Sequence, residues 1–196
     1  MKNLYFVRHG IAQHNVLFAT RGGSGFYDKN YTDTKLTNEG IEQSILLGQT
    51  WKNINEIQLV LCSSLSRTLE TSRNIFSGIN IPILALDILK EYPQGLQTCN
   101  KATSKGILIN NYPEIDFTNV EEVDTMWNPQ REETLGELDH RIVLLNEFLK
   151  KRDETEIAII GHSSFIGQYK DKKIGLIENG DEELLHCYPY KVESRL

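Results

Sequence analysis

The chain has 196 residues, of which 39% are hydrophobic and 24% charged, and its formal net charge at pH 7 is −6. That length and apolar content predict a single folded domain over residues 1–196 and exclude a disordered chain. The negative charge argues against a nucleic-acid partner, and the apolar runs are too short for a membrane span of roughly 20 residues. Three widely spaced cysteines form no zinc or disulfide pattern, so we expect reduced thiols and a cytoplasmic location.

Strand and helix patterns alternate along the chain. Short apolar runs predict buried strands at residues 3–8, 59–63, 81–86 and 157–161, and a weaker edge strand at 184–190. Apolar residues at helical spacing, preceded by capping hydroxyls, predict helices at 38–52, 67–76 and 135–152, with a shorter helix at 163–170. The expected caps are Thr37, Ser66 and Thr134. This order is typical of an α/β fold, a three-layer sandwich around a mainly parallel sheet.

Two segments lack a clear period. Residues 15–35 are rich in Gly, Asn, Asp and Tyr, and they are predicted to form a loop. Residues 90–120 are interrupted by Gly, Asn and Pro, and we expect a mostly irregular insertion at about 92–120 that caps the domain. The acidic run at 178–183 is interpreted as a turn rather than a metal site.

Chemically functional side chains follow each of the four main strands. Arg8 and His9 end the first strand, Arg67 follows the second, Glu91 follows the third and His162 follows the fourth. Because the carboxyl ends of parallel strands meet at one edge of a sheet, we expect these five side chains to converge there.

This set of side chains fits phosphoryl transfer. Guanidinium groups match phosphate oxygens bidentately, and a neutral histidine between them can attack phosphorus. Gly10 would let the backbone approach the phosphate, while a carboxyl group near the leaving oxygen can donate its proton and later activate water. Since the arginines and histidines supply positive charge, neither a metal nor another cofactor is required.

The same positions carry a family resemblance. Residues 4–10, Leu-Tyr-Phe-Val-Arg-His-Gly, resemble the opening signature of the histidine phosphatase superfamily, the phosphoglycerate mutase-like proteins. The resemblance continues at 36–40 (Leu-Thr-Asn-Glu-Gly) and 63–71 (Ser-Ser-Leu-Ser-Arg-Thr-Leu-Glu-Thr). It then reaches Glu91 and ends at 159–163 (Ile-Ile-Gly-His-Ser), so that it covers most of the chain. It implies the phosphoglycerate mutase-like form of the α/β fold.

The resemblance also implies a role for each matching residue. It assigns catalysis to His9 as the nucleophile, to Glu91 as the proton donor and to His162. It assigns phosphate binding to Arg8, Asn15, Arg67 and the backbone amide of Ser163. Asn15 lies six positions after His9, where the family often has a phosphate-contacting Asn, and Glu91 matches by its order after the third strand.

The sequence departs from the glycolytic mutases in several places. Ile11 stands where many members have Glu or Thr, and the loop at 21–30 is longer and richer in glycine. The region after Glu91 differs from the substrate-binding segment of the mutases. Residues 112–117, Tyr-Pro-Glu-Ile-Asp-Phe, are similar to a phosphoglycerate mutase-like branch of fungi and plants.

We therefore expect a metal-independent phosphomonoesterase that acts on a phosphorylated small molecule through a phosphohistidine at His9. Two alternatives stay open: a mutase-like transfer to a second hydroxyl, and non-catalytic binding of a phosphorylated ligand. The sequence names neither the substrate nor the oligomeric state.

Ordinary structural roles compete with some of these assignments. Asn15 is also typical of a turn, and Asp87 and Glu114 are rivals of Glu91 for the acid role. The hydroxyls at 63–64 lack the elbow motif of a hydroxyl nucleophile. The remaining histidines and three loop cations are interpreted as structural or solvated, namely His14, His140, His186, Arg21, Lys101 and Arg131.

Overall fold

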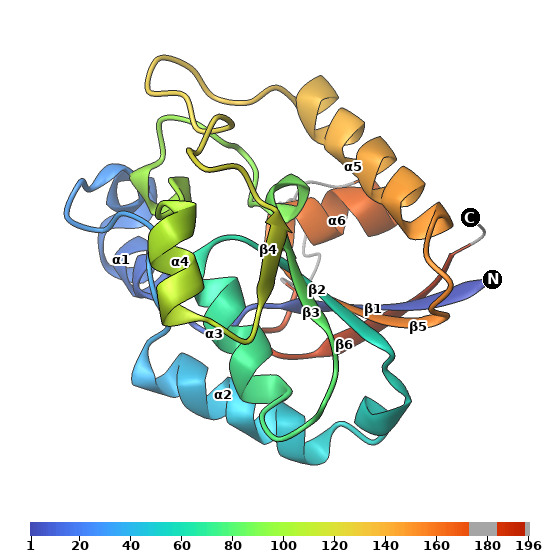
Figure 1. Cartoon of the computed structure of the whole chain (residues 1–196). Coiled ribbons are helices and arrows are strands. Elements are labelled where there is room, and N and C mark those ends of the chain that lie inside the picture. The colour runs from blue at the N-terminus through green and yellow to red at the C-terminus, as the bar shows by residue number, and fades with distance from the viewer. Residues whose placement is uncertain (173–183, 195–196) are drawn as a thin grey trace.

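The computed structural model describes residues 1–172 and 184–194, and these contain a central six-stranded sheet (Figure 1). The strands are β1 (Lys2–Arg8), β2 (Leu59–Ser63), β3 (Ile83–Leu86), β4 (Asp116–Asn119), β5 (Glu156–Gly161) and β6 (Pro189–Ser194). Their order across the sheet is β4-β3-β2-β5-β1-β6. Every neighbouring pair is parallel except β1 with β6, so the mainly parallel sheet is confirmed.

Helices cover both faces of the sheet. They are α1 (Gln13–Arg21), α2 (Asn38–Thr50), α3 (Ser66–Ile75), α4 (Lys105–Asn111), α5 (Leu135–Lys150) and α6 (Ser163–Asp171). In Figure 1, α2 and α3 lie below the sheet while α5 and α6 lie above it. The three-layer α/β sandwich is therefore confirmed. No helix within the described ranges has the length and apolar character needed to cross a membrane.

The two core layers follow from the alternation of side chains along β1. Tyr5 and Val7 point to the face covered by α2 and α3, where they join one apolar cluster. Leu4 and Phe6 point to the face covered by α5 and α6, and they join the other cluster. Because a strand places successive side chains on opposite faces, a strand between two helical layers must be apolar at every position.

The segments predicted to be irregular contain regular structure. Within residues 15–35 the chain forms most of α1 and a 3-10 helix, η1 (Gly22–Tyr27). The loop prediction was wrong here because α1 is short and exposes Val16 and Phe18, which removes the usual one-sided apolar pattern. Within residues 90–120 the structure adds α4 and the four-residue edge strand β4, so that prediction was also wrong in part.

Several element boundaries also differ from the sequence predictions. The N-cap of α3 is Leu65 rather than Ser66, and the Ser66 N–H donates to Asp33 Oδ1 at 2.8 Å from a distant loop. The last strand begins at Pro189 rather than at 184, because its antiparallel register pairs Pro189 with Val7. β3 begins at Ile83, two residues later than expected. The predicted acidic turn at 178–183 lies outside the described residues.

Close backbone packing fixes the loop that follows β1. A Cβ on Gly10 would collide with the Gly40 carbonyl oxygen, and one on Gly40 would collide with the Ile11 carbonyl oxygen. The two glycines therefore let the start of α2 press against the backbone beside His9. Gly10 serves this packing, which the sequence analysis did not anticipate.

We predict that Gly40→Ala lowers the free energy of unfolding by about 1–3 kcal/mol, because the added methyl group collides with backbone that cannot move freely. Gly136→Ala is a matched control, since Gly136 also lies in the first turn of a helix but a Cβ added there would meet no atom within 4 Å. There alanine is expected to be neutral or to stabilise α5 by up to about 1 kcal/mol. Urea denaturation of both variants tests this, and equal effects would contradict it.

Candidate active site

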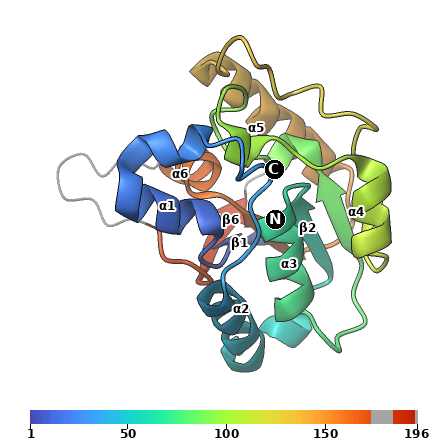
Figure 2. The same cartoon turned by 90° about the vertical axis from the view of Figure 1, so that its left-hand side faces the viewer.

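The carboxyl ends of the central strands bring the predicted side chains together, at the end of the sheet that Figure 2 faces. β1 and β5 pair with Arg8 opposite Gly161, and the His9 N–H donates to the Gly161 carbonyl at 3.0 Å. A histidine directly follows each of these two paired residues, and the ring centroids of His9 and His162 lie 5.2 Å apart. The parallel register thus places the two predicted histidines side by side.

The hydrogen bond of His9 decides which ring nitrogen carries its proton. Nδ1 lies 2.7 Å from the carbonyl oxygen of Gly10. A carbonyl can only accept, so we assign the proton to Nδ1. In the neutral ring Nε2 then keeps its lone pair. His9 is buried, so this orientation is held by the surrounding chain.

The electrostatic environment keeps the buried imidazoles neutral. Burial, and then the charge of Arg67, hold the pKa of His9 well below its ordinary value. The same two causes, in the same order, lower the pKa values of His14 and His162. A histidine that must attack phosphorus needs an unprotonated nitrogen, and this environment supplies one.

Arg67 lies in the first turn of α3 and is fully buried. Its Nη1 donates to the Cys99 carbonyl and its Nη2 to the Asn100 side-chain oxygen, both at 2.9 Å. Its Nε has no hydrogen-bond partner among the described residues. A buried guanidinium with an unsatisfied donor beside two histidines is suited to an anionic ligand.

Arg8 and His162 are held in place by their positions at the ends of regular elements. Arg8 ends β1, and its Nη1 donates to the Leu184 carbonyl at 2.8 Å. His162 is the N-cap residue of α6 and is fully buried. Within residues 1–172 and 184–194, neither ring nitrogen of His162 has a partner. Both nitrogens are thus available to a ligand.

Glu91 lies at the amino end of α6. Its carboxylate accepts hydrogen bonds from the Ser163 hydroxyl at 3.3 Å and from the backbone amides of Ser164 and Phe165 at 3.5 Å and 3.3 Å. Its charge also acts on Arg67, which places it near the guanidinium. The structure therefore brings Glu91 to the residues that directly follow His162, and Ser163 contacts Glu91 through its hydroxyl.

The rivals of Glu91 have structural partners elsewhere. Asp87 is 9% exposed and accepts from the Ser64 hydroxyl at 2.5 Å, and it pairs with buried Lys90 at 3.0 Å. Glu114 is exposed and lies 4.0 Å from Arg73. The oxygen of Asn15 accepts from the Ala12 N–H at 2.9 Å, which is a capping role at the start of α1.

The three loop cations expected to be solvated lie in exposed contacts. Arg21 pairs with Asp28 and Arg131 with Glu137, at 3.0 Å and 2.7 Å. The amino group of exposed Lys101 lies 4.7 Å from the Trp127 ring centroid.

The sequence analysis missed two histidines that belong to the cluster. The rings of His14 and His186 lie 5.5 Å and 5.6 Å from that of His9. His186 Nδ1 donates to the His9 carbonyl at 2.5 Å, and His14 Nδ1 lies 2.8 Å from the Thr34 hydroxyl. The sequence analysis interpreted both as structural or solvated residues, and it did not expect them beside His9. The sequence signal for His14 was its spacing from His9. This spacing indicates a contact between the two rings only if the helix that begins at Gln13 is already known.

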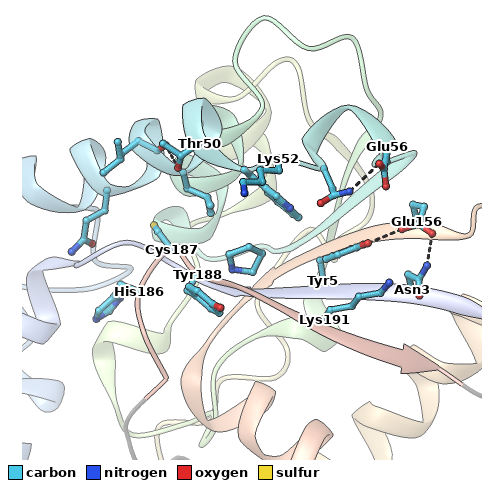
Figure 3. A pocket seen from close by; sticks show the side chains of 16 residues that line it. Asn3, Tyr5, Thr50, Lys52, Glu56, Glu156, His186, Cys187, Tyr188 and Lys191 are labelled. Atoms are coloured by element: carbon cyan, nitrogen blue, oxygen red, sulfur yellow. Dashed lines mark hydrogen bonds between the residues drawn. The ribbon is translucent and has the colours of Figure 1, made fainter.

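A groove of about 760 Å³ lies between the end of α2 and the β1–β6 edge, and His186 also lines it (Figure 3). Two of its polar side chains share a partner, since Tyr5 and Asn3 both donate to Glu156. Lys191 lies over the Tyr5 ring, 5.8 Å from its centroid. The groove therefore borders the imidazole cluster through His186.

Fold and site together define an α/β protein with a buried, cationic histidine site at the carboxyl ends of its parallel strands. A sequence model of the histidine phosphatase superfamily (branch 1) matches residues 4–172, and the chain belongs to this superfamily. A phosphoglycerate mutase-like protein of Arabidopsis thaliana is 27% identical over 197 positions, which cover 84% of this chain and 72% of the relative.

Solved structures share the fold. The ecdysone phosphate phosphatase of Bombix mori, in complex with tungstate, aligns with a TM-score of 0.65 and 18% identity over 100% of this chain and 90% of that one. The alpha-ribazole phosphatase of Shigella flexneri aligns with a TM-score of 0.57 and 22% identity over 84% and 76% of the two chains. At these identities the likeness establishes the fold.

We predict a steep loss of stability below about pH 6.5, the pKa of histidine in an unfolded chain. Below that pH the unfolded chain binds protons at His9, His14 and His162. In the folded chain the lowered pKa values keep these three histidines unprotonated. The stabilisation is thus present above that pH and lost as the pH falls. Urea denaturation between about pH 7.5 and 4.5 measures the slope. His14→Gln should reduce this slope by about one bound proton.

A second prediction concerns the support of Arg67. Asn100 is 2% exposed, and its amide nitrogen lies 3.1 Å from the Pro93 carbonyl, which aims its oxygen at Arg67. Asn100→Ala removes a charge-assisted hydrogen bond, so we expect orthovanadate, a phosphate analogue, to bind about tenfold more weakly. Exposed Asn110→Ala is the control. Unchanged affinity in calorimetry of the Asn100 variant would rule out this positioning role.

Proposed function

We propose that the protein is a metal-independent phosphomonoesterase that acts on a phosphorylated small molecule through a phosphohistidine at His9. One observation carries the proposal: His9 presents a neutral ring whose Nδ1 is engaged by the Gly10 carbonyl, beside the buried guanidinium of Arg67. That combination gives a nucleophile and a cationic phosphate site in one place. Membership of the superfamily supports phosphoryl transfer as the class of reaction.

In the first step Nε2 of His9 attacks phosphorus. An N–P bond forms as the ester P–O bond breaks, and the leaving oxygen takes a proton from Glu91. Arg8, Arg67 and His162 would balance the charge of the transferring phosphoryl oxygens, as arginine and histidine do in metal-free phosphoryl transfer.

In the second step Glu91 acts as a base. It takes a proton from water as the water oxygen attacks phosphorus, the N–P bond breaks, and inorganic phosphate leaves with His9 neutral and Glu91 protonated again. The hydrogen bonds from the start of α6 support this role because they fix the carboxyl group beside His162. The backbone amide of Ser163 and the Asn15 side chain are proposed as further phosphate contacts. A cytoplasmic location and a single domain over residues 1–196 stay predictions.

The test is phosphate release from alkyl phosphates in the presence of a chelator. The wild type should release phosphate, and His9→Ala should release none. Glu91→Gln should lose about 10²–10⁴-fold on an alkyl ester but still form the phosphoenzyme with p-nitrophenyl phosphate, whose leaving group needs no proton. Exposed Glu114→Gln and His140→Gln are the matched controls and should keep full activity.

Other results would favour the alternatives. Exchange of phosphate between glycerate hydroxyls without net release would indicate a mutase. Tight orthovanadate binding without any turnover would indicate a binding module. Release that requires a divalent metal, or survives in His9→Ala, would overturn the proposed mechanism.

A further inference from the structure

A series of aromatic rings leads from His9 to the surface. The His9 and His14 ring centroids are 5.5 Å apart, and those of His14 and Phe26 are 6.0 Å apart. Phe26 in turn stacks on Phe18 at 5.2 Å, with the two planes within 5° of parallel. Exposure rises along the series, from 2% at His9 and 8% at His14 to 52% at Phe18. The series therefore runs from the buried His9 ring to a ring that solvent reaches.

We infer that Phe26 and Phe18, with His14 between them and the nucleophile, form the subsite for the alcohol part of the substrate, and that this part is an uncharged apolar or aromatic group. The inference rests on the proposed phosphomonoesterase activity and names its substrate class. Aromatic side chains bind flat apolar groups through burial of area and offset or edge contacts between rings. α1 lies beside the carboxyl ends of the strands in Figure 2, as such a subsite requires.

The charge of this segment supports an uncharged alcohol. Residues 13–27, which form α1 and η1, carry one charged side chain, Arg21. Arg21 is paired with Asp28 at 3.0 Å. His14 adds no charge at neutral pH, because burial and the nearby arginines lower its pKa. A second anionic group, such as the carboxylate of a glycerate phosphate, would therefore find no unpaired cation on this segment.

The ring pair is held at a fixed distance from the phosphate site. The Thr98 hydroxyl lies 3.2 Å from the Phe26 carbonyl oxygen and 2.9 Å from that of Asp28. Thr98 begins the 3-10 helix η4 (Thr98–Asn100), whose last two residues accept the hydrogen bonds of Arg67. One short segment thus anchors both the aromatic pair and the phosphate-binding arginine. Such preorganisation lowers the entropy lost when a substrate spans the two subsites.

The experiment compares two esters with similar alkoxide leaving groups, 2-phenylethyl phosphate and glycerol 1-phosphate. The wild type should prefer 2-phenylethyl phosphate by about tenfold in kcat/KM, and Phe18→Ala and Phe26→Ala should each reduce this preference by about three- to tenfold. Val143→Ala is the control, because Val143 lies on α5 and its exposed fraction of 51% is close to that of Phe18. A second measurement compares the binding of 2-phenylethylphosphonate and methylphosphonate by calorimetry, which needs no turnover.

The outcomes separate the subsite from the proposed function. Equal kcat/KM for the two esters, or a preference that neither phenylalanine variant changes, overturns the aromatic subsite while leaving the hydrolase. If neither ester is hydrolysed but the phenylethyl preference in phosphonate binding depends on Phe18 and Phe26, the subsite stands and the proposed hydrolysis fails. If neither hydrolysis nor phenylalanine-dependent binding is found, both are overturned.

Discussion

The burial of positive charge at the ends of the parallel strands is the constraint on which the rest of the site depends. Arg8 and Arg67 are 5% and 0% exposed, and Arg67 receives no carboxylate partner at hydrogen-bonding distance within the described chain. Buried charges are costly unless they are hydrogen-bonded and balanced. Carbonyl and amide oxygens supply hydrogen bonds to these guanidinium groups, but they offset only part of the free-energy cost of burying the charges. Burial and then the remaining positive potential lower the pKa values of the neighbouring imidazoles, an environment that suits the proposed phosphate ligand.

Two carboxylates, Asp33 and Glu133, stabilise the segments that carry the site residues. Asp33 accepts from the Ser66 amide, the Ser66 hydroxyl and the Thr103 amide at 2.8–2.9 Å, which joins the start of α3 to the insertion that carries Asn100. On the opposite side, Arg141 forms a buried pair with Glu133 at 2.7 Å and donates to the Lys90 carbonyl, directly before Glu91. These networks fix the backbone next to Glu91 and the start of α3, which carries Arg67.

The sequence predicted the positions of site residues that follow strands better than the positions of those that lie in loops or short helices. Residues 59–63 form β2 with the predicted bounds, and the order of strands was enough to bring His9, Arg67 and His162 together. His14 and His186 could not be placed in this way. His14 depends on a short helix whose apolar face is exposed, and His186 depends on an isolated bridge to Arg8 before β6 begins. Asn100 gave no signal, because its role depends on a distant backbone carbonyl that orients its amide.

Hydrogen-bond partners, rather than proximity, distinguish the four histidines from one another. His9 and His186 each face a carbonyl, which fixes the proton on Nδ1, whereas His14 faces the Thr34 hydroxyl, which can donate or accept. Neither nitrogen of His162 has a partner in the described chain, so its tautomer is free to follow the ligand. A fixed lone pair suits a nucleophile, and a ring with an adjustable proton suits a group that must donate to different phosphoryl oxygens as the reaction proceeds. The Gly10 carbonyl, beside the close packing of Gly10 and Gly40, therefore gives His9 the fixed Nε2 lone pair that the proposed attack on phosphorus needs.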